Sequence, residues 1–75
     1  MSPIVERIRG VQEFLCRQPH LTEFGIKCRP SLDDGFRWMA WCHWESDTRR
    51  RASFGSGGDE LMAWLMLQTT VEQGD

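Results

Sequence analysis

The segment from Phe36 to Glu45 constrains the fold most, because its side chains alternate in a period of two. One set of positions holds Phe36, Trp38, Ala40, Cys42 and Trp44, and the other holds Arg37, Met39, Trp41, His43 and Glu45. Successive side chains of a β-strand point to opposite faces of a sheet. We therefore predict a strand over 36–45 that turns its even-numbered rings toward a core and leaves Trp41 on the other face.

Two further strands are predicted beside this one. Residues 24–28 alternate as well, with Phe24, Ile26 and Cys28 on the inward positions, and Pro30 and the turn Asp33-Asp34-Gly35 follow. Ser46-Asp47-Thr48 is a polar turn, and 49–54 supplies a third strand with Ala52 and Phe54 expected to face inward. Joined in this order, the segments predict a three-stranded antiparallel sheet.

Helical patterns lie at both ends of the chain. Ser2-Pro3 opens an apolar stripe at Ile4, Ile8, Val11 and Leu15, which predicts a helix over 3–17 that ends before Pro19. A second helix is predicted over 59–72, after a glycine-rich turn at 55–58, with Ser56-x-x-Asp59 as a capping box. The predicted fold is α+β, with two helices packed on one face of the sheet in the order α-β-β-β-α.

Length and cysteine usage indicate one small domain in a reducing compartment. Seventy-five residues suffice for one core only, and the longest apolar run, Leu61 to Leu67, is too short to span a bilayer. The N-terminus carries charges and lacks the pattern of a signal peptide. Three cysteines cannot pair completely, so we expect reduced thiols and a cytoplasmic location.

The charge is uneven along the chain. Residues 1–54 hold all nine basic side chains against seven acidic ones, whereas 55–75 hold Asp59, Glu60, Glu72 and Asp75 and no base. Such a polarised field steers charged partners without fixing their identity.

No motif indicates catalysis, a cofactor or a metal. The cysteines and histidines lack the spacing of zinc ligands, and Cys42 and His43 are neighbours that point to opposite faces of a strand. The glycines of 55–58 could approach a phosphate, but Asp59 and Glu60 would repel an anion there. We expect a protein that is not an enzyme.

The order α-β-β-β-α resembles that of the double-stranded RNA-binding domain over nearly the whole chain, by topology alone. That resemblance implies the fold. The family binds phosphates through a lysine-rich start to its second helix, where this chain has Gly57-Gly58-Asp59-Glu60-Leu61. The charge of this stretch has the wrong sign for that contact.

Two surfaces are candidates for binding. The outer sheet face is expected to carry aromatic and basic groups together, although Trp41 could instead lie under arginine stems through cation–π packing. Its expected members are Trp41, Met39, His43, Lys27, Arg29, Arg37 and Arg51. Arg49, Arg50 and Arg51 form a basic hairpin, which either contacts nucleic acid or protects an edge strand from aggregation by its charge. On the second helix, Leu61, Trp64, Leu65 and Val71 form one face, while Met62 and Met66 fall to its side and are expected either to contact a partner or to be buried more deeply.

These surfaces predict a small protein-binding module without catalytic activity. Small chains of this kind include inhibitors of host defence complexes from phages and mobile elements, such as anti-CRISPR proteins. The alternative is a nucleic-acid-binding domain that uses the basic groups and stacks a base on Trp41. A third reading is a homodimer joined through the second helix.

Overall fold

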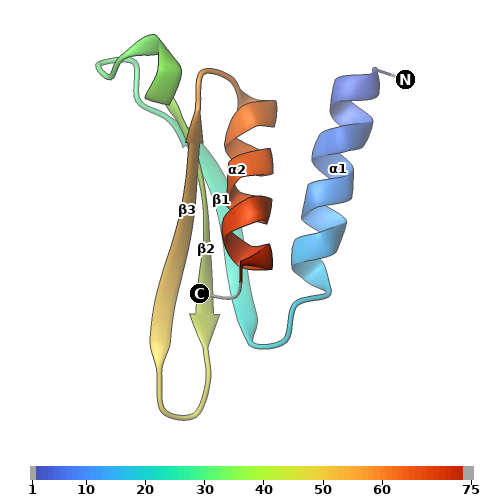
Figure 1. Ribbon diagram of the computed structural model, residues 1–75. Coiled ribbons are helices and arrows are strands. Elements are labelled where there is room, and N and C mark those ends of the chain that lie inside the picture. Colours follow the sequence, from blue (N-terminus) through green and yellow to red (C-terminus); the bar gives the residue numbers. More distant parts are fainter. Residues whose placement is uncertain (1, 74–75) are drawn as a thin grey trace.

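The computed structural model describes residues 2–73, which form two helices and a three-stranded sheet (Figure 1). Helix α1 spans Pro3–Cys16 and α2 spans Glu60–Glu72; the strands are β1, Leu21–Cys28, β2, Trp38–Glu45, and β3, Arg50–Gly57. A short 3₁₀ helix, η1, spans Asp34–Phe36 before β2. The predicted α-β-β-β-α order and α+β class are confirmed. Asp75, counted above among the acidic residues, lies outside the described residues.

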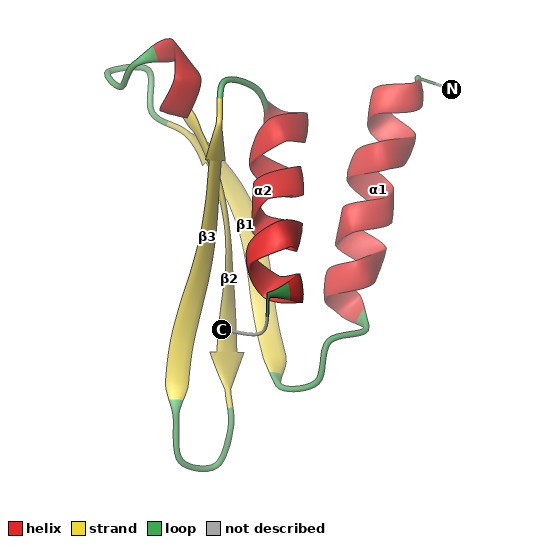
Figure 2. Cartoon of the chain, viewed as in Figure 1, coloured by secondary structure: helices red, strands yellow, loops and turns green. Residues whose placement is uncertain are grey.

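The strands form an antiparallel sheet in the order β1-β2-β3. Both helices lie on one side of it (Figure 2), with α2 against β3 and β2, and α1 packed chiefly on α2. The hairpin between β2 and β3 is closed by Ser46 and Arg49, whose backbones exchange hydrogen bonds of 2.9 and 3.3 Å. No helix among residues 2–73 is long and apolar enough to cross a membrane.

The predicted alternation of β2 is confirmed within the strand. Ala40, Cys42 and Trp44 are buried beneath the helices, and Trp41 lies on the opposite face. Phe36 was wrongly expected to face the core. The turn at 33–35 continues into η1, so β2 begins only at Trp38, and the Phe36 side chain is 61% exposed.

The alternation predicted for the third strand is wrong. Ser53, Gly55 and Gly57 face the helices, whereas Ala52 and Phe54 face away from them. The reason is the register with β2: paired residues of antiparallel strands share a face, and Ser53 pairs with the buried Cys42.

Gly55 and Gly57 were predicted to lie in a turn between the third strand and the second helix. They belong to β3 instead. A Cβ atom added at Gly55 would meet the backbone N of Leu67 and lie 2.7 Å from the carbonyl O of Ala63. Helix α2 therefore rests directly on the β3 backbone, which is possible only because this position has no side chain.

Helix α2 begins one residue after its cap, Asp59. The Asp59 carboxylate accepts a hydrogen bond of 2.8 Å from the backbone N–H of Met62, an arrangement that satisfies a free amide of the first turn. Ser56, predicted as the cap, lies in β3 instead.

The buried core combines α1, α2 and the covered sheet face. Its buried apolar members are Val11, Leu15, Ala40, Cys42, Trp44, Ala63, Trp64 and Leu67.

The three cysteines are free and differ in exposure. Cys42 is buried, and burial raises the pKa of its thiol. Cys16 is exposed, and so is Cys28, which was predicted to face inward. Cys28 ends an edge strand that α1 touches little, so no helix covers it.

Candidate functional site

The sheet face turned away from the helices is the candidate site, and we call it the outer face. No helix covers it in the part of the chain that the structure describes (Figure 2). The strand registers assign its members. They are Glu23, Gly25 and Lys27 of β1, Met39, Trp41, His43 and Glu45 of β2, and Arg50, Ala52, Phe54 and Ser56 of β3.

Trp41 lies at the centre of the outer face, between Gly25 on β1 and Phe54 on β3. Its indole lies across Gly25, since a Cβ atom added there would come within 2.6 Å of the indole Cζ2. The His43 ring is tilted by 36° to the indole, with ring centroids 4.9 Å apart. Trp41 is half-buried by these neighbours and stays accessible from outside.

Phe54 extends the apolar surface of Trp41 toward the open edge of the sheet. Ser46 and Arg49 form a hydrogen-bonded pair, and such pairs alternate with non-bonded ones along an antiparallel ladder. Trp41 and Phe54 therefore form a non-bonded pair, the kind in which side chains come closest. Phe54 is 52% exposed, a large value for so apolar a side chain.

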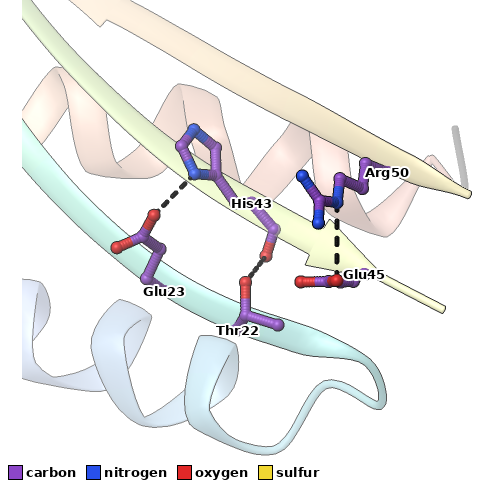
Figure 3. Close-up of polar contacts among 5 residues, drawn as sticks. All are labelled: Thr22, Glu23, His43, Glu45 and Arg50. Carbon is purple, nitrogen blue, oxygen red and sulfur yellow. Dashed lines mark hydrogen bonds and ion pairs between the residues drawn. The ribbon is translucent and has the colours of Figure 1, made fainter.

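Polar contacts fix the half of the outer face nearest the β2–β3 turn (Figure 3). His43 Nδ1 lies 2.8 Å from Oε1 of Glu23, and the Thr22 hydroxyl donates to the His43 carbonyl at 3.3 Å. Arg50 Nε lies 3.4 Å from Oε1 of Glu45. These groups line a hollow of about 540 Å³ beside the aromatic centre. The outer face thus combines an apolar centre with a charged rim and a recess.

The predicted basic residues do not form one surface. Lys27 and Arg50 lie on the outer face, and Arg50 is paired with Glu45. Arg51, predicted to lie there too, is on the helix-covered face: it pairs with Trp44, and its guanidinium carbon stands 5.1 Å from that ring. The arginine–tryptophan stack considered for Trp41 is thus found at Trp44 among residues 2–73.

Arg29 and Arg37 lie beyond the ends of β1 and β2. The backbone N–H of Arg29 donates to the Arg37 carbonyl at 2.7 Å, which closes the segment that contains η1. The Arg37 guanidinium is 2.6 Å from a carboxylate oxygen of Asp34, and its Nε is buried. Arg37 therefore holds η1 in place through its ion pair with Asp34.

Arg49 lies in the turn between β2 and β3. Together with Arg51 and His20 it lines a second hollow, of about 350 Å³, with Trp44 and Val71 as its apolar wall. No carboxylate of residues 2–73 lines this hollow. His20 has a φ of 68°, uncommon for a residue other than glycine, and its carbonyl accepts a hydrogen bond of 2.8 Å from Glu45 N.

Met62 and Met66 are exposed on α2, by 48% and 45% respectively. The deeper burial considered for them from the sequence is therefore wrong. Ala63, Trp64 and Leu67 supply the buried face of α2 instead.

Sequence reasoning missed Phe54 and Gly25 as parts of the site. The signal that could have located Phe54 is the two-residue turn Asp47-Thr48. Pairing Ser46 with Arg49 across that turn places Phe54 opposite Trp41. No comparable signal gives Gly25, because its partner depends on how β1 aligns with β2.

Comparison of the chain with protein-family models, curated proteins and solved structures finds no match. The resemblance to the double-stranded RNA-binding domain therefore extends to element order alone. No group of three or more His, Cys, Asp or Glu side chains among residues 2–73 is placed to hold a metal ion.

Proposed function

We propose that this chain is a small protein-binding module that docks through the outer face of its sheet, with Trp41 at the centre. The observation that carries the proposal is the position of the large apolar side chains. Trp41, Phe54 and Met39 stand together on a face that no helix of residues 2–73 covers, and none of the three is buried. Tryptophan, methionine and arginine are enriched at the cores of protein interfaces.

The charges on the outer face favour a protein over a nucleic acid as the partner. Glu23 and Glu45 stand among Lys27 and Arg50, so the rim is balanced in sign. A phosphate backbone needs unpaired cations. A partner with an apolar side chain for the Trp41–Phe54 surface and polar groups of both signs around it fits this rim.

A domain without chemistry of its own acts by occupying a surface. Inhibition of a larger assembly, such as a host defence complex, is an activity of this kind. The three cysteines of this chain are free thiols, which suits the reducing conditions of a cytoplasm.

The test replaces the aromatic centre and compares it with an equal change on the helices. Partners are first captured from the native cell with the wild-type chain and identified by mass spectrometry. The binding of one purified partner is then measured for Trp41→Ser/Phe54→Ser and for the control Ile4→Ser/Val5→Ser, whose residues are exposed on α1.

We expect the outer-face variant to weaken binding by at least about a hundredfold, since hot-spot aromatics cost about 2 kcal/mol or more each on truncation. The control should bind within about threefold of wild type. Equal binding by both variants, with both folded by circular dichroism, would contradict the proposal.

Nucleic-acid binding is the second candidate, and the hollow beside the hairpin favours it. Arg49, Arg51 and His20 line that hollow, and its wall holds no acidic side chain from the described part of the chain. Labelled single- and double-stranded oligonucleotides titrated at about 50 and 200 mM salt separate the two functions, because a phosphate-driven complex weakens steeply over that interval. Absence of binding at the lower salt concentration would remove this candidate.

A further inference from the structure

A hollow lies between the β2–β3 hairpin and the ends of the two helices. In Figure 1 the hairpin reaches past the last turn of α2, and the loop that joins α1 to β1 lies at the same end of the molecule. The hollow has a volume of about 350 Å³, and its wall takes His20 from that loop, Val71 from α2, Trp44 from β2 and Arg51 from β3. It therefore lies on the helix side of the sheet, apart from the outer face.

Two arginines of the hairpin line this hollow without a carboxylate partner. Arg49 and Arg51 are two positions apart, about 7 Å along an extended chain, and alternate residues of a strand share a face. Neither guanidinium forms an ion pair within residues 2–73. Arg50, between them, lies on the outer face and is paired with Glu45. Two positive charges on the helix side are thus free to meet a ligand.

The backbone on both sides of the hollow is fixed by hydrogen bonds. Ser46 and Arg49 exchange backbone hydrogen bonds of 2.9 and 3.3 Å, which close the turn. The N–H of Glu45 donates to the carbonyl of His20 at 2.8 Å and holds that residue at its positive φ of 68°. The His20 imidazole and the Ser46 hydroxyl therefore start from fixed positions on the wall and add to the donors of the arginines.

The helix ends beside the hollow reduce its positive charge without cancelling it. Helices α1 and α2 end at Cys16 and Glu72, and neither has a base in its last turn. The C-terminal end of a helix corresponds to about half a negative charge, so two such ends offset about one of the two guanidinium charges. The Glu72 side chain does not line the hollow. A net positive charge therefore remains for an anion.

The hollow has the size and the mixed lining of a site for a small molecule. Such sites have volumes of about 300 to 1,000 Å³ and combine apolar walls with a few polar groups. Here Trp44 and Val71 form the apolar wall. The guanidinium carbon of Arg51 lies 5.1 Å from the centre of the Trp44 ring, and a guanidinium stacked on a ring keeps N–H donors at its edge. An anionic group can thus bind the arginines while the rest of its molecule meets the apolar wall.

We propose that this hollow binds a small organic molecule that carries a phosphate monoester. At neutral pH such a group has a charge of about −1.5 to −2 and three acceptor oxygens. One group can therefore accept hydrogen bonds from both guanidiniums and from the Ser46 hydroxyl. A carboxylate has one charge and two oxygens, which leaves one of the two arginines without a partner. The organic part of the ligand lies against Trp44 and Val71.

One phosphate monoester fits these cations better than a nucleic-acid strand does. Each phosphodiester of a strand has one negative charge, and a row of cations along a groove binds successive phosphates. The cations of the hairpin are instead gathered in one hollow, since Arg50 lies on the other face and the adjoining turn carries Asp47. The ligand thus differs from the nucleic acid considered above for the same hollow, and its binding does not depend on docking through the outer face.

Titrations followed by two-dimensional NMR test the ligand. Two monoesters, adenosine 5′-monophosphate and phenyl phosphate, are compared with inorganic phosphate and with the dinucleoside phosphodiester ApA, at about 50 mM salt. At least one monoester should bind with a Kd below about 1 mM and shift the amides of His20, Ser46 and Arg51 but not those of Gly25 and Trp41. Inorganic phosphate should bind at least about threefold more weakly because it lacks an apolar part, and ApA at least about tenfold more weakly because it has one charge.

Three results of these titrations would overturn the proposal. The first is that neither monoester shifts the amides around the hollow at about 10 mM ligand. The second is equal affinity for inorganic phosphate and both monoesters, which would show that the apolar wall takes no part. The third is that ApA or a longer oligonucleotide binds more tightly than either monoester, which would favour the nucleic-acid function.

Two neighbouring arginines of the hairpin provide matched variants. Arg49→Ala should raise the Kd of the tighter monoester at least about tenfold, because it removes a charged hydrogen-bond donor from the wall. Arg50→Ala removes the same charge from the opposite face and should change this Kd less than about threefold. Equal effects of the two folded variants would indicate general attraction to the hairpin and overturn the proposal. Binding of a protein partner through Trp41 and Phe54 is measured separately, so the failure of one proposal is distinguishable from the failure of the other.

Discussion

The two faces of the sheet both carry large apolar side chains, but they place them differently. At the centre of the covered face stand Ala40, Cys42, Ser53 and Gly55, all of them buried. On the uncovered face, the largest apolar side chains are those of Met39 and Trp41 on β2 and Phe54 on β3. The rings of the covered face, Trp38, Trp44 and Phe24, therefore surround a centre of small side chains, whereas the rings of the open face occupy its centre.

The side chains at the centre of the covered face are small because α2 comes so close to the strands there. With Gly55 under Ala63 and Leu67, the space between helix and sheet is filled by backbone at the centre and by helix side chains around it. Trp64 supplies one such side chain and meets Phe24 edge to face, with ring centroids 5.8 Å apart. The centre of the core is thus filled by α2, and the rings of the covered face pack around it.

The largest effect is expected where the small face meets α2. Gly55→Val should lower the free energy of unfolding by about 3 kcal/mol or more, because the added carbons meet helix backbone that cannot move aside. Urea unfolding followed by circular dichroism measures the loss. Gly10→Ala is the control: an added Cβ has no neighbour within 4 Å in α1, so this change should stabilise by about 0.5 to 1 kcal/mol. Similar stability of the Gly55 variant and wild type would show that α2 does not rest on β3.

A smaller loss is expected at the one glycine on the outer face. Gly25→Val should cost about 1 to 2 kcal/mol, since the indole of Trp41 must leave its place above the β1 backbone. Because that indole is a side chain and can move, Trp41→Ala should remove most of this cost in the double variant. Additive costs in the double-mutant cycle would contradict the contact between Gly25 and Trp41.

Loss of a ring from the open face should cost less still. Phe54→Ser should change the free energy of unfolding by less than about 1 kcal/mol, because half of the side chain is already in water. Leu67→Ala, on the packed side, should cost about 2 to 5 kcal/mol in the same urea experiment. Comparable losses at the two positions would erase the distinction between the faces.

The smallest effect concerns pH. Burial raises the pKa of the Cys42 thiol above that of a thiol in the unfolded chain, whose ordinary value is 9.0. The neutral thiol therefore contributes fully to stability below that pH, and the contribution is lost as the pH rises through the folded value. Cys42→Ala should show a flatter decline of stability above about pH 9. In native protein at neutral pH, a thiol reagent should modify the exposed Cys16 and Cys28 quickly and Cys42 only on unfolding.

The sequence predicts the element order and the sides of β2 because strong local patterns encode both. The set Trp38, Ala40, Cys42 and Trp44 is apolar throughout, whereas the alternating set includes Arg37, His43 and Glu45, so the inward face of β2 can be assigned. The sides of β3 could not be read in this way. Its local pattern favours burying Phe54, and only the pairing with β2 across the Asp47-Thr48 turn places that ring outside.

The sequence predicts the centre of the candidate site and part of its surroundings, since Met39, His43 and Lys27 also lie on the outer face as expected. Trp41 followed from the alternation of β2, whereas the position of Arg51 depended on the register of β3. Phe36 was misplaced because a turn and a short helix interrupt the alternation just before β2 begins. Contacts between strands depend on the register in which segments distant in the sequence pair, and the pattern within one segment does not determine that register.

The glycine beneath Trp41 has a thermodynamic consequence for recognition. An exposed indole that swings freely loses about 0.5 to 1.5 kcal/mol of conformational entropy when a ligand immobilises it. Here the ring is already supported from below by bare main chain and from the side by an imidazole that a carboxylate anchors. Its outward π surface is accordingly preorganised, and most of the ordering cost is incurred during folding rather than during association.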